Sequence, residues 1–226
     1  MDGQLREISS NVDTINMVMR DLGGLYYRTR SAIILTQIKS QADPLLVVFG
    51  DSIVEQMYCP ATDGLNVVNA GISGSKALES LPFLQQVLAA SKGPLVVLSI
   101  GANDAFGASV ASPEQFAAGY EALARAVLDS GRALVVATLP PMEPGKLAAE
   151  HFHHPSIAAY NTRIREIGQR LGARVADVDD ALDRWRQGRP EGATVDGVHL
   201  NGQAAAVWRD TVYAAVKSAL AARPSP

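Results

Sequence analysis

The sequence predicts a three-layer α/β/α fold with a parallel sheet of about five strands, preceded by a helical extension. Several short apolar runs are rich in valine, are bounded by glycine or proline, and do not alternate with polar residues. Such runs are typical of strands that helices cover on both faces. Helical patterns lie between the runs, and this alternation favours a parallel sheet with right-handed crossovers.

The composition narrows the class of protein. With 226 residues, 47% of them hydrophobic and 19% charged, the chain can bury the core of one globular domain. The net charge of −3 and the scattered basic residues argue against nucleic-acid binding. A single cysteine, Cys59, rules out an intramolecular disulfide.

The expected location follows from what the sequence lacks. The chain does not start with basic residues followed by an apolar run, and no apolar stretch is long enough to cross a bilayer. We therefore expect a soluble, cytoplasmic protein without a membrane span. A leader that had been cleaved off would leave the same sequence.

Residues 1–41 form the predicted helical extension, and residues 42–226 form the predicted α/β domain. Seven apolar residues of the extension are spaced alternately by three and four positions: Leu5, Ile8, Val12, Ile15, Met19, Leu22 and Tyr26. This heptad seam ends where Gly23 and Gly24 interrupt it, and a second apolar patch covers residues 33–38. The helix either docks on its own domain or pairs with other copies. The narrow seam favours a homo-oligomer.

The remaining elements follow in order along the chain. Strands are predicted at residues 45–49, 65–69, 95–100, 133–139 and 173–178. A short helix is predicted from Ile53 to Tyr58. A longer one begins at the capping box of Ser112 and Gln115 and ends before Gly131. Two more are predicted over residues 155–171 and after the N-cap Asn201.

Small and polar residues follow three of the predicted strands. The three turns are Gly50-Asp51-Ser52, Asn69-Ala70-Gly71 and Gly101-Ala102-Asn103-Asp104. In a parallel sheet, such turns lie along the edge formed by the carboxyl ends of the strands, where open α/β sheets bind ligands. The topology therefore predicts that these turns converge on one crevice.

Ser52 is the candidate nucleophile of this crevice. A serine hydroxyl needs a nearby base, and His199 follows Asp196 by three positions, so that one loop supplies a base and the carboxylate that orients it. The N–H groups of Ser52 and Gly71 and the amide of Asn103 are the candidate oxyanion donors. We interpret Asp51 and Asp104 as residues that hold the turns.

Four blocks in this order resemble the SGNH (GDSL-type) hydrolase superfamily. They are Gly50-Asp51-Ser52-Ile53, then Gly71, then Gly101-x-Asn103-Asp104, then Asp196-x-x-His199. The resemblance spans residues 50–199 and implies a flavodoxin-like fold and an esterase or acyl-transfer activity without a metal. By matching position, it assigns Ser52, Asp196 and His199 to a triad and Gly71 and Asn103 to the oxyanion hole. Ile53 replaces the leucine of many members.

The sequence thus predicts a carboxylic ester hydrolase that acts through an acyl-enzyme on a small-molecule ester. An acyltransferase with the same triad and a non-catalytic binding module on the same fold are the alternatives. We expect short acyl chains to be preferred, because no inserted lid is present and the loops are short. No cofactor and no metal are expected: His151, His153 and His154 share one loop but lack the helical spacing and the carboxylate of a zinc site.

Overall fold

The sheet has five parallel strands in the order β2-β1-β3-β4-β5 in a computed structural model of the chain. The structure describes the backbone of residues 2–222 and the side chains of residue 12 and residues 14–222. The strands are β1 (Leu45–Gly50), β2 (Asn66–Gly71), β3 (Leu95–Ser99), β4 (Ala133–Ala137) and β5 (Arg174–Ala176). This is the flavodoxin-like order, and it confirms the predicted fold.

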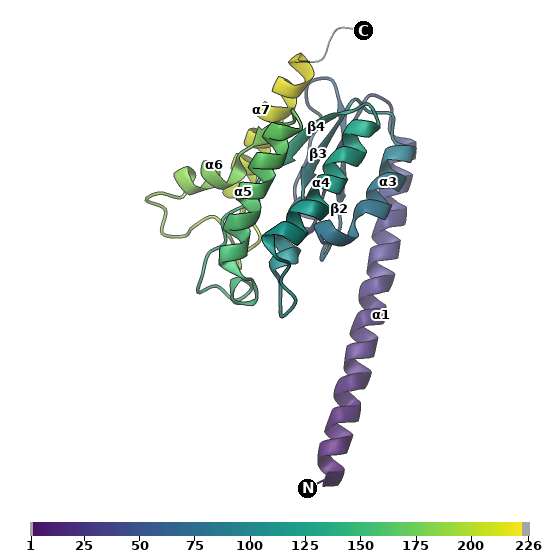
Figure 1. Cartoon of the computed structure of the whole chain (residues 1–226), viewed down its shortest axis with the longest axis vertical. Coiled ribbons are helices and arrows are strands. Elements are labelled where there is room, and N and C mark those ends of the chain that lie inside the picture. Colours follow the sequence, from purple (N-terminus) through teal and green to yellow (C-terminus); the bar gives the residue numbers. More distant parts are fainter. Residues whose placement is uncertain (1, 223–226) are drawn as a thin grey trace.

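Helices cover both faces of the sheet, as Figure 1 shows. One face is covered by α1 (Asp2–Ser40), α3 (Leu81–Ala90), α4 (Pro113–Asp129) and α5 (His154–Arg170). The other face is covered by α2 (Ser52–Glu55), α6 (Val178–Trp185) and α7 (Gly202–Ala221). Three short 3-10 helices lie in the loops: η1 (Ala77–Glu79), η2 (Ala102–Ala105) and η3 (Ala149–His151).

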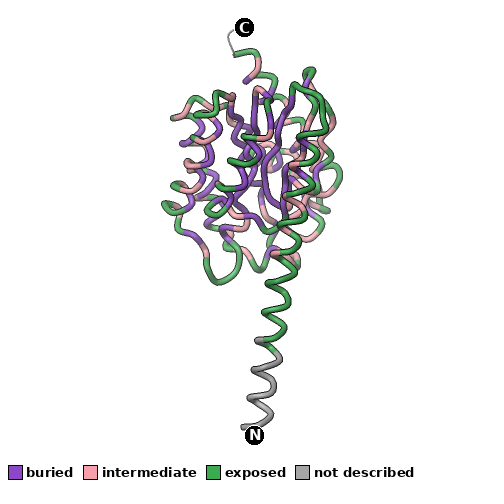
Figure 2. Tube along the Cα trace, turned by 90° about the vertical axis from the view of Figure 1, so that its right-hand side faces the viewer, coloured by how far each residue is buried: buried purple, intermediate pink, exposed green. Residues whose placement is uncertain are grey.

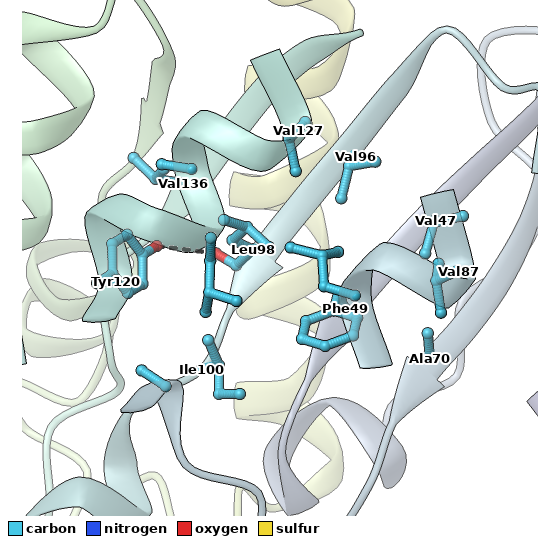
Figure 3. Close-up of a cluster of buried hydrophobic side chains, with 14 of the residues drawn as sticks. Val47, Phe49, Ala70, Val87, Val96, Leu98, Ile100, Tyr120, Val127 and Val136 are labelled. Atoms are coloured by element: carbon cyan, nitrogen blue, oxygen red, sulfur yellow. Dashed lines mark hydrogen bonds between the residues drawn. The ribbon is translucent and has the colours of Figure 1, made fainter. Parts of the chain in front are cut away.

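Alternate strand residues point to the two helical layers. In the layer that contains α3 and α4, Phe49, Val96 and Leu98 of the strands pack against Val87 and Tyr120 of the helices (Figure 3). The residues between them pack into the second layer. Because all six residues of β1 are buried, neither face of this strand can carry polar residues, which explains its continuous apolar run.

The capping signals predicted two helices correctly. In α4, Ser112 and Gln115 form both hydrogen bonds of the capping box, and Asn201 accepts two backbone N–H groups at the start of α7. Helix α3 was not predicted. Its N-terminus lacks a side-chain cap, so no start signal marks it, although Phe83, Leu84, Val87 and Leu88 form one buried face.

Helix α1 runs without a break through Gly23 and Gly24, the two residues that interrupt the apolar seam. Two glycines cost a helix roughly 1 kcal/mol each, too little to end it when the helix packs on a domain. Ile34 and Ile38 are buried in the core, so the second half of α1 belongs structurally to the α/β domain. None of the helices within residues 2–222 has the length and apolarity that a membrane span requires.

The first half of α1 extends away from the domain (Figures 1 and 2). The seam residues Val12, Ile15, Met19 and Leu22 are between 49% and 64% exposed. Leu5 and Ile8 lie outside the residues whose side chains are described. From Val12 to Leu22 the seam is therefore not covered by the chain's own domain.

Candidate active site

Ser52 begins α2 directly after β1. The turn between them is tight: a Cβ on Gly50 would lie 2.3 Å from both the Ser99 carbonyl oxygen and a methyl of Val54. Asp51 caps the short helix by accepting the N–H of Ile53 at 3.0 Å. A buried strand, a close-packed glycine and a capped turn thus fix the position of Ser52 at the carboxyl edge of the sheet.

The structure brings the side chains of Ser52, His199 and Asp196 together. Ser52 Oγ lies 2.9 Å from His199 Nε2, and His199 Nδ1 lies 2.7 Å from Asp196 Oδ2. With the ring proton on Nδ1, the hydroxyl donates to Nε2 and the imidazole donates to the carboxylate. This is the geometry by which a base can take the proton of a serine nucleophile.

Asp196 remains ionised at this position. Burial raises the pKa of its carboxyl, but hydrogen bonds from the His199 ring and from the N–H groups of His199 and Val198 outweigh burial and lower the pKa. The two backbone bonds, 2.8 and 3.0 Å long, also hold the carboxylate under the imidazole. One short turn therefore sets both the charge and the orientation of this pair.

A second loop braces the turn that carries Asp196 and His199. Glu143 accepts the N–H groups of Ala193 at 2.6 Å and Thr194 at 3.1 Å, and its own N–H donates to the Gly197 carbonyl at 2.9 Å. Lys146 donates to Glu143 and to the Thr194 carbonyl, both at 2.6 Å. Burial raises the pKa of Glu143, but these hydrogen bonds outweigh it and lower the pKa to about 2.

Asn103 lies in η2, directly after β3. Its side-chain amide donates to the carbonyl of Ser75 at 3.1 Å, which ties it to the turn that follows β2. That turn is closed by a bond of 3.1 Å from the Ser75 N–H to the Ile72 carbonyl, and Gly74 within it has a φ of +79°. Within residues 2–222, the N–H groups of Ser52 and Gly74 have no hydrogen-bond acceptor.

Gly71 does not have the geometry that its predicted role requires. Its N–H donates to Asn69 Oδ1 at 3.0 Å, so this hydrogen is already engaged. A Cβ at Gly71 would lie 2.2 Å from the N of Glu55, so glycine is needed here to let α2 approach β2. The predicted oxyanion role of Gly71 is therefore corrected to a packing role. In the same turn, the N–H of Gly74 is free to act as the donor.

Asp51 and Asp104 hold turns, as the sequence analysis proposed. Asp51 also accepts the N–H of Gly101 at 3.4 Å, which links the turns after β1 and β3. Burial raises the pKa of Asp51 to about 6, even though backbone N–H groups oppose the shift. Asp104 accepts the N–H of Ala77 at 2.8 Å and so fixes the start of η1.

The three clustered histidines serve the loop beside the site. His153 Nδ1 lies 2.8 Å from Ser156 Oγ, and His154 Nε2 lies 2.8 Å from the Ala149 carbonyl oxygen. Among residues 2–222, no three His, Cys, Asp or Glu side chains are grouped so that they could hold a metal ion. Phe106 and Phe152 stack edge-on beside this loop, with ring centroids 5.0 Å apart.

Sequence reasoning missed Arg30, Glu55 and Glu143. These side chains reach the site from α1, α2 and a loop, and nothing in their local sequence marks the contact. Gly74 did carry a signal, because Ser-Gly is a common turn pair in sequences. The structure shows the left-handed φ that such a turn requires of glycine.

Comparison with known proteins gives the family. The model of the GDSL-like lipase/acylhydrolase family matches residues 48–207. The chain therefore belongs to this family of hydrolases and esterases, and the predicted resemblance is confirmed. No curated protein matches the sequence.

Solved structures share the fold at low sequence identity. A lipase/acylhydrolase from Enterococcus faecalis superposes with a TM-score of 0.66 at 19% identity, over 78% of this chain and 96% of the other. A carbohydrate acetylesterase from Sinorhizobium meliloti superposes with a TM-score of 0.66 at 16% identity, over 78% of this chain and 99% of the other. For a variant of an acetyl xylan esterase from Geobacillus stearothermophilus, the TM-score is 0.64 at 16% identity, over 79% of this chain and 96% of the other.

Proposed function

We propose that the chain is a serine esterase that cleaves carboxylic esters of short acids through an acyl-enzyme. The observation that carries the proposal is the continuous hydrogen-bonded series from Ser52 Oγ through the His199 ring to Asp196. Membership of a hydrolase and esterase family supports the reaction class.

In the proposed mechanism, His199 takes the proton of Ser52 as the hydroxyl oxygen attacks the ester carbonyl. The carbonyl electrons move to the oxygen, and the N–H groups of Ser52 and Gly74 and the Asn103 amide stabilise the resulting oxyanion. The intermediate collapses, and His199 gives its proton to the departing alcohol. Water then attacks the acyl-enzyme with His199 again as the base, which releases the acid and restores Ser52.

Substitution of Ser52 by alanine tests this mechanism. Hydrolysis of p-nitrophenyl acetate should fall by about three orders of magnitude or more, because only binding and oxyanion contributions remain. Ser130→Ala, which removes a hydroxyl remote from the site at the C-terminus of α4, is the matched control. A fluorophosphonate should label Ser52, as judged by mass spectrometry of the digested protein. A folded Ser52→Ala variant with a tenth of the activity would exclude Ser52 as the nucleophile.

The acyl preference is tested with a series of p-nitrophenyl esters. Acetate and butyrate should be cleaved with a higher kcat/KM than dodecanoate, because the loops after the strands are too short to enclose a long chain. The acetylesterases among the structural neighbours are in line with this preference. Faster cleavage of the dodecanoate would contradict it. Adding an alcohol acceptor and measuring its acylation separates hydrolysis from acyl transfer.

A further inference from the structure

Arg30 of α1 reaches the end of β2, far from it in sequence. Its Nε donates to the Gly71 carbonyl at 3.1 Å, and its Nη2 donates to the Asn69 carbonyl at 3.3 Å. Because β2 is an edge strand, its outer carbonyl groups have no partner strand. The half-buried guanidinium also lies 3.5 Å from Glu55 Oε1, so it joins the strand end to α2.

Glu55 continues this connection to the turn after β2. Its Oε2 accepts both the N–H and the hydroxyl of Ser73 at 2.6 Å, and its Oε1 accepts the hydroxyl of Tyr26 on α1. Burial raises the pKa of Glu55, but these hydrogen bonds and the charge of Arg30 outweigh it, and the net pKa is lowered. Glu55 is therefore a carboxylate that binds the turn with its charge.

The turn at residues 72–75 is thus held at both ends. Glu55 fixes the N–H of Ser73, and Asn103 fixes the carbonyl of Ser75. Between these anchors lies Gly74, which has a left-handed φ and whose N–H has no acceptor within residues 2–222. The direction of this N–H depends on the Ser73–Gly74 peptide plane, and a donor that is misaimed by about 1 Å loses much of its catalytic effect.

We propose that Arg30 and Glu55 are positioning residues of the oxyanion hole, through which α1 becomes part of the active site. The proposal rests on the proposed function and adds two residues to it. Neither side chain is placed to touch a substrate: they hold the turn that presents Gly74. Their loss should impair the transition state, in which the oxyanion forms, more than the binding of the neutral ester.

The test is a kinetic comparison of Arg30→Met with Arg28→Met. Both variants keep the aliphatic stem and lose a guanidinium on the same helix, but Arg28 makes no contact with the turn. With p-nitrophenyl acetate, kcat of Arg30→Met should fall about 10- to 100-fold while KM changes less than about threefold. Arg28→Met should retain the wild-type kcat. An unchanged kcat in folded Arg30→Met would overturn the proposal.

Two further measurements separate positioning from general stability. Millimolar guanidinium should restore part of kcat to Arg30→Ala and should do nothing for Arg28→Ala. The losses in Arg30→Met and Glu55→Gln should not multiply in the double variant, because both act through the same turn. If Arg30→Met does not fold, Glu55→Gln decides: an unchanged kcat overturns the proposal, and a reduced kcat at constant KM supports it. Absence of Ser52-dependent hydrolysis in the wild type would instead refute the proposed function.

Discussion

At the scale of single residues, Asp196 serves the His199 imidazole in two ways. One carboxylate oxygen accepts the Nδ1 proton, and the other accepts two backbone N–H groups of the same turn. The first contact selects the tautomer that leaves Nε2 free to receive a proton, and the second prevents the carboxylate from rotating away.

Replacing Asp196 by asparagine should therefore leave the fold intact and remove most of the activity. An amide can donate to Nδ1, which favours the wrong tautomer, and it cannot stabilise an imidazolium. In a triad this change costs about four orders of magnitude in kcat, as the serine proteases show. Steady-state kinetics should show such a loss in Asp196→Asn and none in Asp129→Asn, which alters an exposed carboxylate at the end of α4. A loss of less than tenfold would contradict the assignment.

The pH profile offers a separate check at this scale. A histidine base works only in its neutral form, so kcat/KM should rise with pH. Asp51, whose pKa burial raises to about 6, loses its proton within the range measured and should contribute to the same rise, because its carboxylate holds the turns after β1 and β3. The lowered pKa of Asp196 keeps its carboxylate charged between pH 5 and 8, so Asp196 should add no ionisation of its own there. Initial rates between pH 5 and 8 provide the measurement, and a flat profile would exclude a histidine base.

The oxyanion donors show where the sequence stops being informative about single residues. The order of the motifs pointed to Ser52 and Asn103, which follow predicted strands, and to Asp196 and His199, which precede the predicted final helix. The motif could not say in which direction a backbone N–H points. Gly71 lies within three residues of Gly74, yet only the structure shows that Asn69 already engages the Gly71 N–H.

At the scale of elements, two loops far apart in sequence act as one unit. Residues 143–149 hold the turn of residues 193–199 through the carboxylate of Glu143 and the ammonium of Lys146. Gly197 fits tightly between them, since a Cβ there would lie 2.6 Å from that of Ala149. The positions of Asp196 and His199 therefore depend on a charge on another loop.

Glu143→Gln should lower both stability and kcat/KM, and the stability loss should depend on pH. The folded pKa of about 2 lies below the usual 4.5, so the carboxylate contributes fully above about pH 4.5. This contribution is lost as the pH falls towards 2. Urea unfolding of wild type and variant should show a difference that shrinks over this range. Glu191→Gln, which changes an exposed carboxylate near the same turn, should show no such difference.

The elements that the sequence predicted well carry a clear local signal, such as a continuous apolar run or a polar helix cap. The central strands are buried on both faces, and α4 and α7 begin with polar caps, so local signals and tertiary structure agree. In α1 the pair Gly23 and Gly24 interrupts the apolar pattern, whereas the helix itself continues through both glycines. The hydrogen bonds of Glu143 could not be predicted from the local sequence, because their partners lie about 50 residues further along the chain.

At the scale of the whole molecule, α1 has two halves with different surroundings. From Tyr27 onwards it packs on the domain, and its N-terminal part extends beyond the domain (Figure 1). The contacts of Tyr26 and Arg30 with Glu55 and the end of β2 fix this direction. The segment of α1 that directly precedes Tyr26 therefore leaves the domain beside the candidate active site.

We propose that a second copy of the chain binds this extended half. The exposed seam of Val12, Ile15, Met19 and Leu22 is widened by Val18 and Leu25, which are also exposed. Burying each such side chain contributes about 1.5–3 kcal/mol, enough for two or more helices to associate through the seam. On each side of the seam lie the heptad positions e and g, which in residues 14–25 are Asn16, Val18, Gly23 and Leu25. None of these residues is charged, so identical helices can meet without repulsion.

Changing Ile15 to lysine should therefore yield a monomer, whereas Met17→Lys should not. Both residues are more than half exposed in a single chain, so neither change should destabilise the domain itself. Only Ile15 lies in the seam, and a lysine there would place charges against each other between paired helices. Sedimentation velocity at micromolar concentration should show an oligomer for the wild type and Met17→Lys, and a monomer for Ile15→Lys. Deleting residues 2–24 should give the same monomer and keep the esterase activity, because Tyr26, Arg30 and the residues of the site remain. A monomeric wild type, or equal behaviour of the two lysine variants, would contradict pairing through this seam.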